Sequence, residues 1–598
     1  MEIKTFDERL KLGNGDYDRL VNSRKPKGID EKKAYIIGTG IAGLSTAGFL
    51  IKDAKMDPSK IVFLEKDDIA GGALDGKVLL NSGYVARGGR ETGNRFETLW
   101  DILSVIPSRE NPEMSILDDL YYTNLDDPNF SNCRITKNNG QRYDNGKFNL
   151  SKDVIKEIIH LILTPDEKLQ GISVEEVLSD EFLESDFWTY YRTMFAFENW
   201  HSVLELKLYI NRFIHLVGGL PNLSALQFTR YDQYESIVVP MMKWLKDKGV
   251  KTEYNFEVSD IEFNITKDKK VATKIIASDS KTGEDKSISL TENDLVFVTT
   301  GSLVESSVYG NNNKAPSIDI DTEESFKLWK NIAKKSDDFG HPEVFTSDID
   351  KTNWESATVT VKSKEISSYI EKITKRSPYT GKVVTGGIVS VLDSNWLMSW
   401  TINRQGQYIG QPEDEIAVWV YALFTDKEGD YIKKPMKFCT GEEIAKEWLY
   451  HIGVPESDID RLAKETSTVP VFMPYITAQF MPRSFGDRPY VVPKNAVNFA
   501  FLGQFVETLD NPGRDTVFTT EYSARCAMEA VYVLTGVEKK VPEVFASRYD
   551  IRYVLAGVSV LNDGEKPELD LPFGADAIVG KKIAGTEIEK MLKEYNLI

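Results

Sequence analysis

The chain has 598 residues, enough for two to four domains with a large core, and its 41% hydrophobic and 28% charged residues are typical of a soluble globular protein. Its net charge of −19 argues against nucleic acid as a general partner, because phosphate binding requires a basic surface. No apolar run is long enough to span a bilayer, and the charged N-terminus is unlike a signal peptide. The three cysteines are widely separated and form no CxxC pair, so we expect reduced thiols and a cytoplasmic location.

The N-terminal third of the chain begins with a polar leader and continues with an α/β unit. We expect residues 1–31 to be an arm laid over the body of the protein. The stretch AYIIGTGIAGLSTAGFLIKDAKMDPSKIVFLE (residues 34–65) then predicts a buried strand at 35–37, a glycine turn, a helix and a second strand that ends at Glu65. This order of elements is typical of a dinucleotide-binding fold.

The glycine turn has the chemistry of a phosphate cradle. A helix that begins in such a turn presents free N–H groups, here including that of Ala42, and the positive end of its dipole to a pyrophosphate. Gly38 permits the tight turn, Gly40 lets the backbone approach the phosphates, and Gly43 lets helix and strand pack closely. Glu65, at the tip of the second strand, is placed to accept the ribose hydroxyls of an adenosine.

A second glycine-rich region follows directly. The loop KDDIAGGALDGK contains Gly71 and Gly72, which permit a close approach of backbone to the cofactor. In NSGYVARGGRETGN, four glycines and two arginines surround one carboxylate, Glu91, which beside a cofactor would serve as a general base toward water. The alternative is a solvated loop in which Glu91 only pairs with an arginine. The cofactor contacts expected from this loop are Arg87, Gly88, Gly89 and Arg90.

The middle of the chain predicts helices followed by two further nucleotide-domain strands. Residues 151–216 read as mostly helical, with Ser151 as a cap. A helix capped at Gly249 leads to a strand over 251–258, whose Val258 is placed as in flavoproteins that bring such a residue near the adenine. A strand at 295–298 rejoins the nucleotide sheet and turns beside the cofactor at Thr300, Gly301 and Ser302.

The C-terminal half contains a predicted substrate domain and a return to the nucleotide sheet. The segment VVTGGIVSVLDSNWLMSWTINRQ alternates as a strand pair does. A strand at 499–502, a turn at Gly503 and a helix from about Thr519 would bring a helix N-terminus back to the cofactor. The tail KKIAGTEIEKMLKEYNLI predicts an amphipathic helix that packs on the core, with membrane contact as the alternative. Its apolar residues are Ile583, Ile588, Met591 and Leu592.

These elements predict the α/β class: a Rossmann-like FAD-binding domain of discontinuous segments, an α+β substrate domain and a helical C-terminal region. The discontinuous sheet, the distant Gly503 segment and the turn at Thr300 and Gly301 favour FAD over NAD. The five histidines show no metal-ligand spacing, so we expect structural roles for them and no metal. The expected boundaries are 1–31 for the arm, 32–130, 235–310 and 490–540 for the FAD-binding domain, 131–234 and 311–489 for the substrate-binding domain, and 541–598 for the C-terminal region.

Six blocks spread over the chain resemble one known family. RGGRE, FETLWD, MFAFENWHS, GGLPNLSALQFTRYDQYES, TINRQ and TVFTTEYSARCAMEAVY resemble, in this order, the oleate hydratases, also called myosin-cross-reactive antigens. The resemblance runs from about Lys25 to the C-terminal helix. It implies an FAD-containing hydro-lyase that adds water to a cis double bond of an unsaturated fatty acid of the oleate or linoleate type. It also implies a cytosolic homodimer that draws its substrate from membrane or free fatty acid.

The resemblance assigns roles to individual residues. The catalytic glutamate of the family falls on Glu91 and its catalytic tyrosine on Tyr209, which without the resemblance would be read as a core residue of a helix. Two departures concern the substrate: Thr92 replaces the usual methionine of GGREM, and LDNPGR (509–514) is an apparent insertion. The residues that hold the fatty-acid carboxylate in the family fall on Gln233, Thr401 and Asn403.

Two other functions remain open on the residues alone. The first is a flavin oxidoreductase of the amine-oxidase or desaturase type acting on a lipid, which shares the sheet topology but would transfer electrons. The absence of a cysteine pair argues against its flavin-disulfide branch. The second is a non-catalytic FAD protein that binds lipid or a partner surface, in which Glu91 and Tyr209 would be dispensable.

Overall fold

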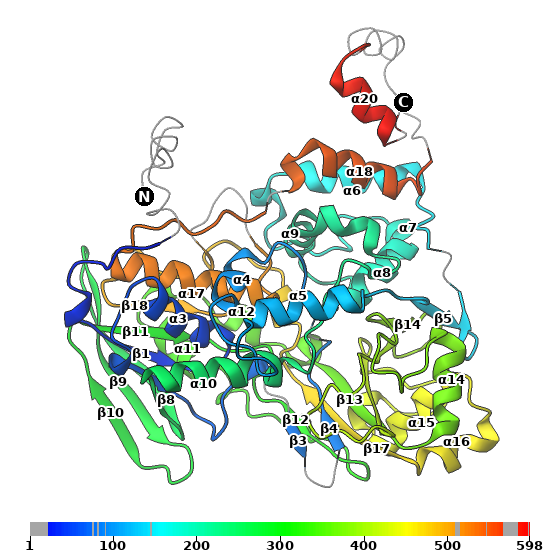
Figure 1. Cartoon of the computed structure of the whole chain (residues 1–598), viewed down its shortest axis with the longest axis horizontal. Helices are drawn as coiled ribbons and strands as arrows, with labels where there is room; N and C mark the ends of the chain where they lie inside the picture. The colour runs from blue at the N-terminus through cyan, green and yellow to red at the C-terminus, as the bar shows by residue number, and fades with distance from the viewer. Residues whose placement is uncertain are drawn as a thin grey trace.

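The structure, a computed structural model, places a parallel nucleotide-type sheet at one end of the molecule and a larger mixed sheet at the other (Figure 1). It describes residues 22–74, 77–79, 83–89, 91–143, 146–508, 515–545, 547–565, 584–595 and 597. The predicted residues Arg90 and Ile583, the apparent insertion 509–514 and most of the N-terminal arm lie outside these ranges.

The nucleotide-type sheet is assembled from distant parts of the chain, as predicted. Its five strands are all parallel and run in the order β18-β11-β1-β2-β7. Such sheets bind ligands at the carboxyl ends of their strands, so the order decides which loops meet there. The strands are β1 (Lys33–Ile37), β2 (Ile61–Leu64), β7 (Lys251–Glu253), β11 (Asp294–Thr299) and β18 (Phe499–Leu502).

One predicted strand is wrong in its extent. The single strand expected over 251–258 is divided into β7, which pairs with β2, and β8 (Phe256–Ile265), which belongs to a separate antiparallel sheet with β9 (Lys270–Asp279) and β10 (Asp285–Ser289). Between them Asn255 has φ 55°, a left-handed conformation that asparagine tolerates better than most residues. Alternation of side chains does not reveal such a kink.

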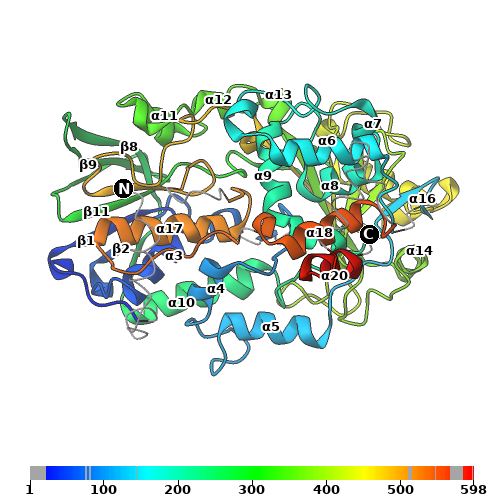
Figure 2. The same ribbon diagram turned by 90° about the horizontal axis from the view of Figure 1, so that it is seen from above.

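Helix α3 (Ile41–Lys52) packs on β1 and β11, and both α17 (Thr520–Thr535) and α10 (Val239–Lys248) contact it (Figure 2). The small residues of α3 permit this close packing: a Cβ on Gly48 would lie 2.4 Å from Cδ1 of Ile102 in α4 (Glu97–Leu103). The predicted cap of α10 is confirmed, because Gly249 ends the helix with φ 104°. One turn of π-helix, Tyr234–Val238, precedes α10.

The larger sheet has eight strands in the order β12-β17-β13-β16-β15-β14-β5-β6. The predicted strand pair is present as β14 and β15, which are antiparallel. Helices α14 (Lys364–Thr374), α15 (Gly441–His451) and α16 (Glu456–Ala463) share a hydrophobic core with this sheet. The strands are β5 (Ile135–Lys137), β6 (Gln141–Arg142), β12 (Val308–Tyr309), β13 (Trp354–Val361), β14 (Val389–Val391), β15 (Met398–Thr401), β16 (Ile416–Ala422) and β17 (Thr466–Met473).

A helical layer lies above the larger sheet in Figure 1 and contains α6 (Lys152–Leu163), α8 (Asp186–Phe195), α9 (Val203–Phe213) and α18 (Ile551–Leu561). The predicted cap is confirmed: the Ser151 hydroxyl accepts the Val154 N–H at 3.3 Å. The remaining elements are β3 (Lys77–Leu79), β4 (Gly83–Val85), α5 (Ile116–Asp126), α7 (Asp180–Leu183), α11 (Lys327–Ala333), α12 (Glu343–Thr346) and α13 (Ile349–Thr352).

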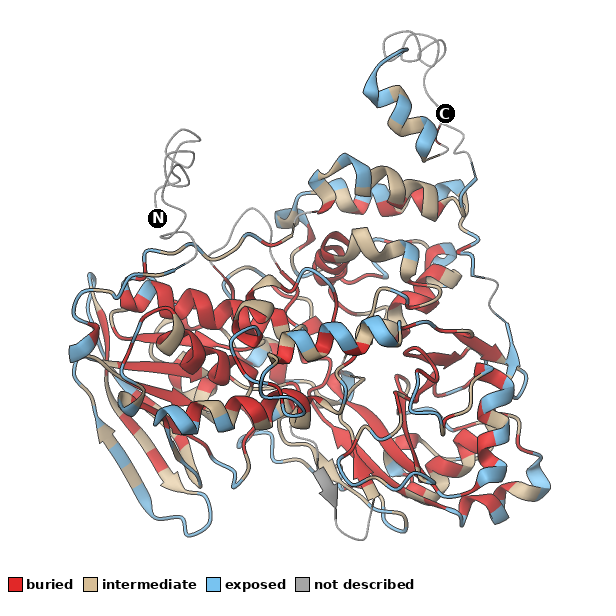
Figure 3. Ribbon diagram, in the orientation of Figure 1, coloured by how far each residue is buried: buried red, intermediate tan, exposed pale blue. Residues whose placement is uncertain are grey.

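The C-terminal helix differs from its prediction. Helix α20 (Glu587–Glu594) has no buried residue, and Ile588 is 45% exposed (Figure 3). The expectation that this helix packs on the core is therefore wrong, because its amphipathic pattern says only that one face is apolar, not what covers it. Within the described ranges, no helix combines the length and the apolar character that crossing a bilayer requires.

The core of the larger sheet contains one carboxyl group, Glu355, that no described residue neutralises. Glu355 lies on β13 and is fully buried, and both carboxyl oxygens lack a hydrogen-bond partner among the described residues. Burial raises the pKa of Glu355 well above its usual range. The unfolded chain ionises this group above about pH 4.3, whereas the folded chain resists ionisation, so Glu355 destabilises the fold increasingly as the pH rises above that value.

We therefore expect Glu355→Gln to raise the melting temperature at pH 8 by a few degrees, corresponding to roughly 1–3 kcal/mol. The gain should shrink as the pH falls toward 5, because the pH then approaches the pKa of about 4.3 of the unfolded group, and keeping the folded group protonated costs less. Thermal unfolding of both proteins between pH 5 and pH 8 measures this, with exposed Glu113→Gln as the control. A gain that is the same at every pH would contradict the assignment.

Candidate functional site

The turn between β1 and α3 has the geometry of a phosphate cradle. Gly38 has φ 90°, and a Cβ on it would lie 2.8 Å from Oγ1 of Thr299. A Cβ on Gly43 would lie only 2.2 Å from the carbonyl oxygen of Gly38. Gly40 caps α3 with no side-chain acceptor, so the N–H groups of the first turn are not used by a cap. The predicted turn thus has the tight contacts and open helix end that a pyrophosphate requires.

Glu65 lies directly after β2 and is held in a fixed orientation. One carboxylate oxygen accepts the Thr39 N–H at 2.9 Å and the Thr39 hydroxyl at 2.5 Å, and the other accepts the Asp67 N–H at 3.1 Å. The Phe256 N–H donates to the Glu65 carbonyl at 2.8 Å, which brings β8 and Val258 beside the tip of β2. The structure therefore brings together the two residues predicted to contact the adenosine.

The predicted turns after β11 and β18 also meet. Gly301 has φ 139°, and Gly503 has φ 102° with a hypothetical Cβ 3.6 Å from the Gly301 carbonyl oxygen. Thr300 donates its N–H to the Leu502 carbonyl at 3.2 Å, and Ser302 follows in the same loop. Thr519 caps α17 by accepting the Tyr522 N–H at 3.1 Å, so its hydroxyl serves the helix.

The two glycine loops of the N-terminal region contact each other. Gly71 and Gly72 have φ 122° and 54°, and a Cβ on Gly72 would lie 3.1 Å from Cα of Gly40. Arg87 donates from Nη2 to the Gly72 carbonyl at 2.8 Å, which ties the RGGRE loop to the phosphate cradle. The loop that carries Glu91 is thus attached to the nucleotide sheet on one side.

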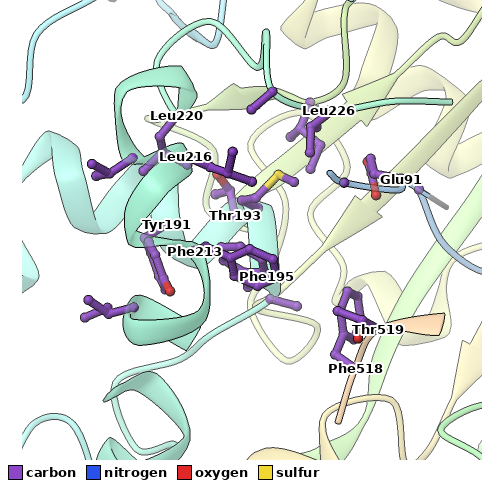
Figure 4. Close-up of a pocket in the computed structure, with 18 of the residues that line it drawn as sticks. Glu91, Tyr191, Thr193, Phe195, Phe213, Leu216, Leu220, Leu226, Phe518 and Thr519 are labelled. Carbon is purple, nitrogen blue, oxygen red and sulfur yellow. The ribbon is translucent and has the colours of Figure 1, made fainter. Parts of the chain in front are cut away.

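On its other side the RGGRE loop borders a cavity of about 380 Å³. Glu91 lines this cavity, and a Cβ on Gly89 would lie 2.5 Å from its Oε1, so the carboxyl group packs against the loop itself. Figure 4 shows Glu91 near Thr519 and Phe518, with Leu216 and Tyr191 on the opposite side. The walls are largely apolar, which suits a hydrocarbon chain. Their main contributions come from residues 214–226 and from α6, α8 and α18, and α9, β13, β16 and the N-terminal end of α17 add one or two residues each.

Thr92, the departure from the family motif, fixes the far end of the loop. Its N–H and hydroxyl both donate to the Gln227 carbonyl, at 2.8 and 3.0 Å, and its carbonyl accepts the Gln227 N–H at 2.9 Å. Thr92 also lines the cavity and is 3% exposed. A methionine would keep the two backbone bonds but not the hydroxyl bond, and it would extend further into the cavity.

Tyr209 is near the cavity but is not one of the residues that line it. Its ring packs against Phe195 and Phe213, which do line the cavity, with centroid distances of 5.2 and 6.3 Å. Burial, followed by the nearby Glu205, raises the pKa of Tyr209 well above its usual value, and Arg488 opposes this shift. The phenol is therefore fully protonated at neutral pH and lies one ring behind the wall.

A second tyrosine, which the sequence did not indicate, lies on the wall itself. Tyr191 lines the cavity, and its hydroxyl is buried without a hydrogen-bond partner among the described residues. Burial raises the pKa of this phenol as well. Tyr191 belongs to the aromatic-rich helix α8, where no local signal distinguishes a wall residue from a core residue.

The predicted carboxylate-binding residues come together in a smaller adjoining cavity. Gln233, Thr401 and Asn403 all line it, although they are far apart in sequence. This cavity shares Arg87, Gly88, Gly89, Gln233 and Trp419 with the larger one, so the two meet at the RGGRE loop. Sequence reasoning missed three charged residues there, Arg230, Asp232 and Arg404. Arg404 pairs through Nε with Asp127 at 2.8 Å, and burial raises the pKa of Asp232 to about 6.

One cluster of metal-ligand residue types, Asp430, Glu447 and His451, lies elsewhere, in the core of the larger sheet. The Glu447 carboxylate accepts three backbone N–H groups, from Asp430, Tyr431 and Ile432, and lies 3.2 Å from Nε2 of His451. Burial opposes protonation of His451, but hydrogen bonds to the two carboxylates outweigh it and raise its pKa. These hydrogen bonds explain why the three residues lie together, so we interpret the cluster as a structural one rather than as a metal site.

Comparison with known proteins gives consistent matches. The model of the MCRA family matches residues 31–532. An oleate hydratase from Streptococcus pyogenes serotype M49 is 47% identical over 98% of this chain and 99% of its own length. A linoleate hydratase from Lactiplantibacillus plantarum is 28% identical over 85% of this chain and 94% of its own length. Among solved structures, a cyclohexylamine oxidase from Brevibacterium oxydans covers 84% of this chain and 99% of its own, at 12% identity and a TM-score of 0.45.

The phosphate cradle can be tested by adding one methyl group. We expect Gly43→Ala to weaken dinucleotide binding about tenfold or more, because the new Cβ would overlap the Gly38 carbonyl and force the turn apart. Titration of the apoprotein with FAD, followed by flavin fluorescence, measures the affinity. Gly218→Ala is the matched control, since its Cβ would meet only Cγ2 of Val560 at 3.4 Å. Equal affinity for both variants would show that this turn does not approach the cofactor.

Proposed function

The chain belongs to the MCRA family, and from this membership we infer that it is a fatty acid hydratase, a hydro-lyase that adds water to a cis double bond of an unsaturated fatty acid. The observation that carries this inference is the 47% identity to an oleate hydratase over almost the whole chain. The site supports it: a largely apolar cavity contains one carboxylate, Glu91, and continues into a small polar cavity.

We propose FAD as the cofactor, held between the N-terminal ends of α3 and α17. The phosphate cradle at Gly38, Gly40 and Gly43 fits a pyrophosphate, and Glu65 fits the adenosine ribose. The loops at Gly71 and Gly301 have positive φ and lie at the carboxyl ends of the strands, where the ring system would extend toward Arg87 and Glu91. When bound, the flavin would supply an electron-rich surface next to the cavity and a wall against which the RGGRE loop is shaped.

We propose that Glu91 is the general base that orients water and removes its proton. It lines the cavity at the side of the RGGRE loop, and the largely apolar walls offer few other hydrogen-bond partners to a water molecule. The proposed acid is Tyr209, whose raised pKa keeps it in the protonated state from which an acid must start. The Tyr209 ring packs against Phe195 and Phe213, which line the cavity, so its proton would enter the cavity at that part of the wall.

The small cavity is the proposed site of the fatty-acid carboxylate. Gln233, Thr401 and Asn403 supply amide and hydroxyl groups there, and Oγ1 of Thr401 lies 3.1 Å from Oγ1 of Thr385, which fixes its position. The distance between this subsite and Glu91 would select which carbon of the chain receives the hydroxyl group.

The surroundings of the cavity suggest where the substrate enters. Leu163 and Ile159 of α6 line the cavity and are 75% and 37% exposed, and exposed Ile551 begins the neighbouring helix α18. An exposed apolar rim fits contact with a lipid surface, to which the exposed α20 would add Ile588. We propose a cytoplasmic homodimer that touches the membrane peripherally. The three buried thiols, Cys133, Cys439 and Cys526, fit a reducing compartment.

Labelled water tests the proposed reaction directly. The purified protein with FAD is incubated with oleate and with linoleate in heavy-oxygen water, and the product masses are measured. Hydration adds one labelled water to the chain, whereas an oxidoreductase would give a product that has lost two hydrogens. Binding without conversion would indicate a lipid-binding protein.

The role of Glu91 can be tested by Glu91→Gln, which keeps the shape of the side chain but removes the base. We expect the hydration rate to fall by about 10²–10⁴-fold while bound FAD is unchanged, because general-base catalysis contributes about this much. Initial rates of hydroxy fatty acid formation and the flavin absorbance measure both quantities. Exposed Glu113→Gln is the control, and full activity of Glu91→Gln would exclude the assignment.

Substrate affinity should depend on Asp232. Burial raises its pKa to about 6, so this group in the small cavity is neutral at pH 5 and anionic at pH 7. The fatty-acid carboxylate would then meet a like charge, and we expect KM to rise several-fold between pH 5 and pH 7. Asp232→Asn keeps an acceptor for the Glu235 N–H and should abolish the rise. KM is measured between pH 5 and pH 7 in both proteins. The same rise in KM in the wild type and in Asp232→Asn would show that Asp232 is not its cause.

A further inference from the structure

The proposed reaction places positive charge in a cavity whose described walls are mostly hydrocarbon, and one part of the wall is suited to that charge. Resting on the proposed function, we propose that the aromatic rings of Trp354, Trp419 and Tyr421 are catalytic: they stabilise the positive charge that develops on the substrate chain as its double bond takes up the proton. We call these three side chains the aromatic wall.

The aromatic wall is a compact cluster on the larger sheet. Tyr421 stacks against Trp354 with a centroid distance of 4.9 Å and against Trp419 at 4.6 Å, and the two tryptophans are 6.1 Å apart. All three line the larger cavity and are at most 6% exposed. They come from β13 and β16, two neighbouring strands in the centre of the sheet, so their positions are rigid.

The strand register places the aromatic wall between the proposed carboxylate subsite at Thr401 and the proposed base, Glu91. Thr401, in the carboxylate subsite, lies directly opposite Trp419, and Ser399 lies opposite Tyr421. Tyr421 therefore lies two residues, or about 7 Å, further along the same face of β16. Tyr421 also lies within the electrostatic influence of Glu91. Burial is the main cause of the raised pKa of Tyr421, and the charge of Glu91 adds to it. A chain anchored at Thr401 would pass over Trp419 and Tyr421 before it reaches the base.

The chemistry explains what such a wall would do. The π electron pair of the alkene takes the proton of the acid, so that one carbon gains a C–H bond and its neighbour becomes electron-deficient. The oxygen of water then bonds to that neighbour, while a proton of the water passes to Glu91. In the transition state the positive charge lies on carbon, where a hydrogen bond cannot reach it. The faces of aromatic rings carry partial negative charge and attract a cation, most strongly where water is excluded.

Hydrogen bonding explains the position of the tyrosine in the aromatic wall but does not explain the two tryptophans. The Tyr421 hydroxyl donates to the Thr193 carbonyl, which fixes the central ring. The indole N–H groups of Trp354 and Trp419, in contrast, have no acceptor among the described residues, although buried tryptophans usually find one. Leucine or phenylalanine would fill these positions without leaving a buried donor unsatisfied. Tryptophan gives the strongest cation–π interaction of the natural side chains.

Fluorinated tryptophan tests the proposal without changing the packing. Tryptophan analogues with one, two and three fluorine atoms are incorporated at position 419 alone, and separately at 354, since each fluorine withdraws electron density from the ring face. We expect the single-turnover rate of hydration to fall stepwise along the series, by about two- to thirtyfold in total, with unchanged KM and FAD content. The single-turnover rate is used because product release does not affect it.

The same series at position 448 is the control. Trp448 is fully buried, but it belongs to the core of α14, α15 and α16 and does not line the cavity, so its fluorination should leave the rate unchanged. Equal rates for all analogues at 354 and at 419 would overturn the proposal, and so would an equal loss at 448. If the unmodified enzyme takes up no labelled water, the proposed function itself fails, and this outcome is distinct from a flat fluorine series.

Discussion

The placement of one carboxylate at the boundary between a phosphate cradle and an apolar cavity is the constraint on which the site depends. Glu91 belongs to a loop that Arg87 ties to Gly72 of the cradle and that Thr92 ties to Gln227 on the other side. Both attachments are hydrogen bonds to backbone, so they do not depend on a flexible partner side chain. For the proposed role of Glu91 as a base, these two attachments would keep its carboxylate at the cavity wall, next to the hydrocarbon chain, rather than in bulk water.

The rest of the fold supplies the two surfaces that meet at this loop. Strands from five distant parts of the chain place their carboxyl ends together, and the positive ends of α3 and α17 reinforce the attraction for an anionic cofactor. The larger sheet provides a rigid floor through β13 and β16, while α6, α8, α9 and α18 close the cavity. The backbone pairing of β13 with β16 fixes the positions of the side chains on the sheet. Helix α18, in contrast, is held by side-chain contacts and has only two buried residues.

The sequence predicted those parts of the protein that depend on local signals. The glycine turn at Gly38, the caps at Ser151 and Gly249 and the strand Phe499–Leu502 all follow from residues next to one another in the chain. The division of β7 from β8 at Asn255 and the exposed position of α20 did not follow, because they depend on contacts with distant segments. In the site, Glu91 carried a recognisable motif, but Tyr191 and the aromatic wall did not, since an aromatic residue in an apolar run reads equally well as core. Arg404 stands in the TINRQ block, but its pairing with Asp127 depends on a contact that is distant in sequence.

The electrostatics of the cavity bear on how the proton and the water are added. Burial raises the pKa of both Tyr209 and Tyr191, so neither phenol readily gives up a proton to leave a separated phenolate. A free carbocation and a free phenolate in this apolar cavity would together be very unfavourable. In the reaction proposed above, proton delivery from Tyr209 is therefore best coupled to attack by water at Glu91, so that only partial positive charge develops on carbon. Stabilisation by the aromatic wall fits such a pathway, because cation–π attraction is modest in size and acts without a counter-ion that would collapse onto the reacting carbon.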